Sequence, residues 1–146
     1  MRPRLQGILL VTFFLGFPAG GLWICWVIAH NNIVNSAKPF AVGAANDILS
    51  KSSVKTLDDY GTLKMRQSQD ESKYAAIRPN MGEFQEISEL RHGKSWADDR
   101  SGTVFQFVQF SGEAKFEKGP AEIKFVTARR TMSPEWRIDS FELKPR

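Results

Sequence analysis

The sequence predicts an α+β fold, in which an N-terminal transmembrane helix precedes helices packed on a curved antiparallel sheet. Three observations predict this fold. Residues 7–29 contain no charged side chain. Apolar residues then recur at helical spacing, and from residue 104 onward they alternate with polar residues as they do in strands. The 146 residues of the chain are enough for one modest domain and an appendage.

The uncharged run GILLVTFFLGFPAGGLWICWVIA is longer than the roughly 20 apolar residues that a helix needs to cross a bilayer. Arg2 and Arg4 precede it, and Lys38 is the first basic residue after it. Basic residues favour the cytoplasmic side of a membrane. We therefore expect residues 7–29 to cross a bacterial inner membrane once, with the N-terminus in the cytoplasm and residues 38–146 in the periplasm.

Two alternatives concern the same segment. Cleavage of a signal peptide after Ala29 would release the domain, but the apolar run exceeds the usual apolar core of roughly 7–15 residues, and Trp23 and Trp26 crowd the cleavage site. A retained anchor or uncleaved signal over residues 1–29 is therefore the favoured interpretation. The second alternative is lipidation of Cys25, but this cysteine follows bulky residues, whereas a lipidated cysteine follows small ones. Cys25 is the single cysteine of the chain, so it has no partner for an internal disulfide.

The region after the anchor predicts a linker and then several helices. Residues 30–37 are polar and turn-prone, which indicates a linker before a domain over residues 38–146. Ser36 can cap a helix whose apolar stripe ends at Leu49, and Ser53 can cap a second one that stops at Gly61. Residues 65–73 are expected to be exposed. Asn80 is expected to cap a further helix, whose stripe is Phe84, Ile87 and Leu90 and whose stop is Gly93.

The C-terminal third predicts an antiparallel meander. Residues 104–110 are aromatic and β-branched, Ser111-Gly112 suggests a bulge or bend, and Lys118-Gly119 suggests a turn. The last strand covers residues 136–143, and its alternation slips between Ile138 and Phe141, which indicates another bulge. The positions expected to face the core are Phe105, Phe107, Ala114, Phe116, Ala121, Ile123, Phe125, Trp136 and Ile138. The positions expected on the opposite, solvated face are Glu113, Lys115, Glu117, Glu122 and Lys124.

The stretch GEAKFEKGPAEIKF, residues 112–125, followed by EWRIDSFEL, residues 135–143, resembles the C-terminal signature of small exported bacterial proteins of the cystatin-like/NTF2-like α+β type. The resemblance implies a long helix cradled by a bent sheet, forming a cone with one open end. It implies little about function, because this architecture hosts enzymes, adaptors and scaffolds. A weaker resemblance is to the single-span cytochrome oxidase assembly family.

Composition and motifs argue against several kinds of chemistry. The formal charge of +4 owes much to Arg2 and Arg4, so a nucleic-acid partner is not expected. His30 and His92 are the only histidines, and neither has ligand spacing to a second one, so no metal or other cofactor is expected. His92 with Asp98 and Asp99 could form a catalytic pair, but the expected core positions carry no titratable group, so catalysis is not expected.

These observations favour a membrane-anchored, non-catalytic extracytoplasmic domain that acts by protein–protein interaction or assembly, with a protein partner or a second copy of the chain. The alternative is a module that binds a small hydrophobic ligand in the cone. Its candidate pocket lining is Phe105, Phe107, Phe116, Phe125 and Trp136. The simpler interpretation of these aromatic residues is a filled core.

Overall fold

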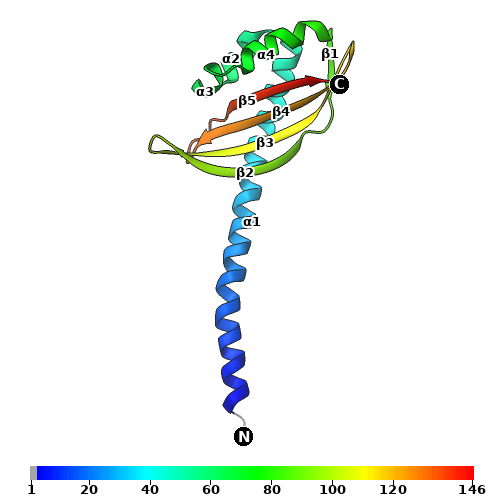
Figure 1. The fold of residues 1–146 in the computed structure, drawn as a ribbon. Helices are drawn as coiled ribbons and strands as arrows, with labels where there is room; N and C mark the ends of the chain where they lie inside the picture. Colours follow the sequence, from blue (N-terminus) through cyan, green and yellow to red (C-terminus); the bar gives the residue numbers. More distant parts are fainter. Residues whose placement is uncertain (1–2) are drawn as a thin grey trace. The chain divides into compact units, whose positions relative to one another are not determined.

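The computed structural model describes residues 3–146, and their side chains from residue 26 onward. The chain forms two compact units, residues 1–32 and residues 33–146. The second unit confirms the predicted α+β class, because helices pack on a five-stranded antiparallel sheet (Figure 1).

The first unit contains the beginning of helix α1, Pro3–Lys51. Most of the predicted membrane span, residues 7–29, lies at positions whose side chains are outside the described residues. Among the residues that are described, no helix has the length and apolarity that a membrane crossing requires. Near the end of this unit the rings of Trp26 and His30 stack at 5.4 Å, and the Trp26 side chain is exposed.

In the second unit, α1 supplies the apolar stripe that the sequence predicts, since Ala41, Ala45 and Ile48 are fully buried. The turn-prone conformation predicted for residues 30–37 is wrong, because these residues are helical. Val34 and Ala37 extend the same stripe by one turn and lie in the core cluster. The Ser36 hydroxyl does not cap the helix but donates to the carbonyl of Ile33 at 3.0 Å, a bond that serine makes inside helices.

Short helices follow α1 and pack against it. They are α2 (Val54–Tyr60), α3 (Leu63–Arg66), α4 (Asp70–Ile77) and the 3₁₀ turn η1 (Arg78–Met81). The predicted cap of α2 is confirmed, because the Ser53 hydroxyl accepts from the amide of Lys55 at 3.2 Å. The expectation that residues 65–73 are exposed is wrong for Met65, which is fully buried.

Two side chains from the later helices close the C-terminal end of α1. The Tyr74 hydroxyl donates to the carbonyl of Ile48 at 2.8 Å, and the Arg78 guanidinium donates to the carbonyl of Leu49 at 2.7 Å. A further Arg78 nitrogen donates to the carbonyl of Gly82 at 2.7 Å. The last carbonyls of a helix lack partners within the helix and favour a nearby cation. Burial raises the pKa of Tyr74 to about 12, so its hydroxyl keeps the proton that it donates.

The predicted helix over residues 84–90 is wrong. Residues Phe84–Ile87 form strand β1, and Arg91–Arg100 form strand β2. The spacing of Phe84, Ile87 and Leu90 fits a helix, but Gly82 has φ of +76°, which a helix start does not tolerate. Pairing with β3 instead brings Phe84 against Phe116, with ring centroids 5.7 Å apart.

The remaining strands are β3 (Thr103–Phe116), β4 (Gly119–Arg130) and β5 (Arg137–Pro145), and the order in the sheet is β1-β3-β4-β5 with β2 also beside β3. Of the bulge or bend predicted at Ser111-Gly112, the bulge is wrong, because β3 and β4 pair in one register throughout. The predicted bulge in the last strand is confirmed. Val126 pairs with Ser140 and Thr127 with Ile138, which leaves Asp139 as the extra residue.

The uninterrupted register of β3 decides which of its side chains face the core. Val108, Phe110, Ala114 and Phe116 lie in the core cluster with α1. Phe105 and Phe107 were expected there, but they alternate with Val108 and Phe110 and so lie on the opposite face. The other expected core positions lie on β4, on β5 or directly before β5, and all are buried in the cluster: Ala121, Ile123, Phe125, Trp136 and Ile138.

Candidate functional site

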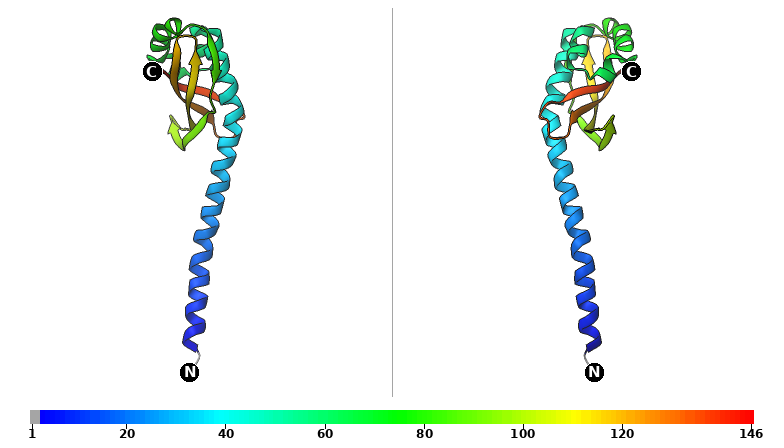
Figure 2. Two further views of the ribbon diagram at one scale, coloured as in Figure 1. Left: turned by 90° about the vertical axis from the view of Figure 1, so that its right-hand side faces the viewer. Right: turned by 90° about the vertical axis from the view of Figure 1, so that its left-hand side faces the viewer.

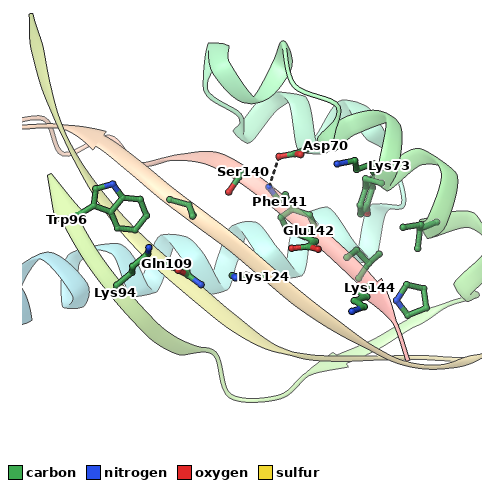
Figure 3. A pocket seen from close by; sticks show the side chains of 15 residues that line it. Asp70, Lys73, Lys94, Trp96, Gln109, Lys124, Ser140, Phe141, Glu142 and Lys144 are labelled. Atoms are coloured by element: carbon green, nitrogen blue, oxygen red, sulfur yellow. Dashed lines mark hydrogen bonds between the residues drawn. The ribbon is translucent and has the colours of Figure 1, made fainter. Parts of the chain in front are cut away.

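The face of the sheet opposite the core carries a groove of about 600 Å³ (Figure 3). Strands β2 to β5 form its floor, and α4 lies beside β5 at one end. Alternation along the strands sends one set of side chains to the core and the other set to this groove. The groove is lined by Asp70, Lys73, Tyr74, Ile77, Lys94, Trp96, Gln109, Lys124, Val126, Ser140, Phe141, Glu142, Leu143, Lys144 and Pro145.

The groove is basic. Four lysines line it, Lys73, Lys94, Lys124 and Lys144, against two acidic residues. One of these, Asp70, is already engaged, since its carboxylate accepts from the amide of Phe141 at 3.2 Å. None of the four lysines forms an ion pair within the part of the chain that the structure describes. Their charges are therefore available to an anionic ligand.

An aromatic platform lies at the β2 end of the groove. The Trp96 indole stacks on the ring of Phe107, with centroids 5.2 Å apart and planes at 13°. Phe107 is fully buried by this contact, while Trp96 keeps 37% of its surface exposed. The Lys94 ammonium lies 5.3 Å from the centre of the indole. A flat aromatic surface beside cations suits the contact of a protein partner or of another ligand with both apolar and anionic groups.

The platform is held in place by an ion cluster centred on the buried carboxylate of Asp139. The Arg100 guanidinium lies 4.5 Å above the Phe107 ring and donates two hydrogen bonds to the Asp139 carboxylate, at 2.6 Å and 2.8 Å. The same carboxylate accepts from the Thr62 hydroxyl at 3.1 Å and from the Lys64 ammonium at 3.3 Å. The β5 bulge aims Asp139 at these partners, which come from β2 and from the start of α3.

Asp139 is the one buried acidic side chain in the described part of the chain, with 4% of its surface exposed. Burial raises the pKa of its carboxyl, but the hydrogen bonds and charge of Arg100, aided by Lys64 and Thr62, outweigh burial and hold the pKa below its ordinary value. Both of its oxygens are occupied by cationic donors. A carboxylate bound in this way is suited to joining elements rather than to moving protons.

The structure does not bring the five candidate pocket residues together. Phe105 and Phe107 lie beside the groove, on the face opposite the core. Phe116, Phe125 and Trp136 lie within the core cluster. There Phe125 stacks between Phe110 and Phe141, with centroid distances of 5.7 Å and 5.8 Å. The core side of these residues is thus filled by other side chains.

The other titratable residues singled out from the sequence are also apart. His92 lies in strand β2 and not at a helix end. Asp98 is six positions further along the same strand, which corresponds to roughly 20 Å. Asp99 accepts from the amide of Gly102 at 2.7 Å and so stabilises the turn. Within the described residues, no group of three His, Cys, Asp or Glu side chains could hold a metal ion.

Sequence reasoning located only part of this site. Lys124 was assigned to the solvated face of its strand, which is correct. Lys94 and Trp96 were missed because β2 is exposed on both faces and so lacks an apolar alternation that would reveal a strand.

No known protein family, curated protein or solved structure matches the chain.

Proposed function

We propose that the protein is a non-catalytic, single-pass protein of a bacterial inner membrane, whose extracytoplasmic domain binds an acidic protein partner in the basic groove. The observation that carries this proposal is the set of four lysines that line the groove together with the exposed Trp96 and form no ion pair within the described residues. An exposed groove with one dominant sign of charge attracts and orients a partner of opposite sign. The uncharged run of residues 7–29 supports the membrane anchor.

The helix-on-sheet arrangement is also consistent with the resemblance to cystatin-like/NTF2-like proteins, and we propose that the domain is a variant of that cone. In this variant the inside of the cone is filled. Side chains without any exposed surface occupy it, among them Ile48, Leu49, Phe110, Ile123 and Phe125. A filled core favours binding at the outer groove over the alternative of a small hydrophobic ligand held inside the cone.

The test is photo-crosslinking of the full-length protein in membranes from a photoreactive amino acid in place of Gln109, in the groove floor. We expect a discrete protein adduct. Reversing two groove charges with Lys124→Glu and Lys144→Glu should reduce its yield about tenfold, because a favourable field becomes a repulsive one. The matched control is Lys55→Glu with Lys118→Glu, which changes the net charge equally at exposed sites outside the groove.

Equal yields from the groove variant and the control variant would contradict the proposal. Adducts with lipid alone would contradict it as well, because they would assign the groove to an anionic membrane surface.

A further inference from the structure

The two outer edges of the sheet differ in whether other parts of the chain bind to them. The edge of β5 is occupied by the helical region: the amide of Thr62 donates to the carbonyl of Ile138 at 2.8 Å, and Asp70 binds the amide of Phe141. Pro145 ends the strand and offers no amide. On the opposite side of the sheet, β2 pairs with β3 and with no other strand among the described residues. Its outer edge faces away from the rest of the domain (Figures 1 and 2).

Strand β2 is ten residues long, and its exposed charges are divided between its two halves, while the terminal Arg100 is paired with Asp139. Arg91 and Lys94 lie in the first half, and Asp98 and Asp99 in the second. All four side chains are exposed. Neither Lys94 nor Asp98 forms an ion pair within the part of the chain that the structure describes.

We propose that this edge binds a second copy of the chain, β2 against β2 in antiparallel orientation, so that one sheet continues through a two-fold symmetric dimer. The two-fold axis of such a dimer is perpendicular to the sheet. The numbers of any two residues that lie opposite one another across it then add up to the same even number. Centring the axis on Trp96 places Lys94 of each copy opposite Asp98 of the other. Each dimer then contains two such ion pairs, both on the groove face.

Edge protection is the competing explanation for an outer strand that carries exposed charges and a register shift between His92 and Ser95. Charges protect an edge when pairing brings like charges together. Here an antiparallel copy meets opposite charges, and only a parallel copy would meet like ones. The charges of β2 therefore disfavour the parallel arrangement and favour the antiparallel one in the register centred on Trp96.

The dimer also has a consequence for the groove. A perpendicular two-fold axis keeps the groove faces of both copies on the same side of the joined sheet, with both Lys94 and Trp96 side chains at the centre. Two basic grooves would thus form one continuous surface. This inference concerns the sheet edge and goes beyond the proposed function, and it holds or fails independently of what the groove binds.

The experiment is sedimentation velocity of the full-length chain in a mild detergent over a range of concentrations. We compare the wild-type chain with Lys94→Glu, Asp98→Lys and the double variant that carries both changes. The wild-type chain should dimerise. Each single reversal puts like charges opposite one another at two places and should weaken dimerisation by about tenfold. The double variant exchanges the two charges and should restore the wild-type dissociation constant to within about threefold.

Lys118→Glu, an exposed reversal in the β3–β4 turn, is the control and should leave dimerisation unchanged. Three results would each overturn the proposal: a monomeric wild-type chain, a dimer insensitive to both single reversals, and a double variant as weak as the single ones. A dimer held together by residues 7–29 would be insensitive to both single reversals and would therefore give the second of these results.

Discussion

At the scale of single residues, Asp139 shows how a local irregularity creates a specific contact. The extra residue in β5 turns one carboxylate toward Arg100 and Lys64 and links β2, β5 and the start of α3. A β-bulge re-aims a side chain in this way while the rest of the strand keeps its alternation. The ion cluster thereby fixes Arg100 above Phe107, and with it the floor on which Trp96 lies.

Asp139→Asn should lower the free energy of unfolding by about 2 kcal/mol near neutral pH, because it leaves Arg100 without its charged partner. The folded state holds the pKa of Asp139 below its ordinary value of 3.8. The stabilisation is therefore present above that value and is lost as the pH falls through the folded-state pKa. Urea unfolding at pH 7 and at pH 3 should show a difference between variant and wild type that is smaller at pH 3.

Glu86→Gln is the control, since it removes an exposed ion pair with Lys115 and should change stability little. A difference between Asp139→Asn and wild type that is the same at both pH values would show that the cluster acts through packing alone.

At the scale of elements, sequence reasoning succeeded where one face of an element is apolar. The stripe of α1 and the alternation in β4 and β5 were predictable, because burial imposes the period of 3.6 or of 2. Residues 84–100 were not, since Phe84, Ile87 and Leu90 fit a helix and β2 has no apolar face. These segments form strands because they pair with β3, and the local spacing of their apolar residues does not indicate that pairing. Of the groove residues, the exposed position of Lys124 could therefore be predicted from the sequence, whereas that of Lys94 could not.

Gly112 in β3 marks a close approach between elements that carries a prediction. A Cβ atom at this position would lie 3.0 Å from a methyl carbon of Leu90, which is buried between β1 and β2. Gly112→Ala should therefore destabilise the domain by about 1 kcal/mol through overpacking. Gly93→Ala in β2 is the matched control, because its Cβ would meet the nearest atom, in Gln109, at 3.7 Å. Chemical denaturation of both variants measures the difference, and equal stabilities would contradict this account of Gly112.

At the scale of the whole molecule, the sheet separates two kinds of surface. One face packs against α1 and is filled with apolar side chains, whereas the other carries lysines and one exposed tryptophan. In the proposed function the basic outer face carries the recognition chemistry, so the partners that we propose depend on the compartment in which that face lies. The orientation of the proposed anchor therefore decides which acidic proteins the groove can meet.

That orientation is testable with a C-terminal alkaline phosphatase, which is active only outside the cytoplasm. The wild-type fusion should be active, because Arg2 and Arg4 favour a cytoplasmic N-terminus. Arg2→Glu with Arg4→Glu should lower the activity several-fold, whereas Lys38→Glu, beyond residues 7–29, should not. An inactive wild-type fusion would contradict the proposed topology. The mass of the mature chain decides between anchor and signal peptide: a chain that begins at His30 has lost residues 1–29, and an intact chain in the membrane fraction has kept them as its anchor.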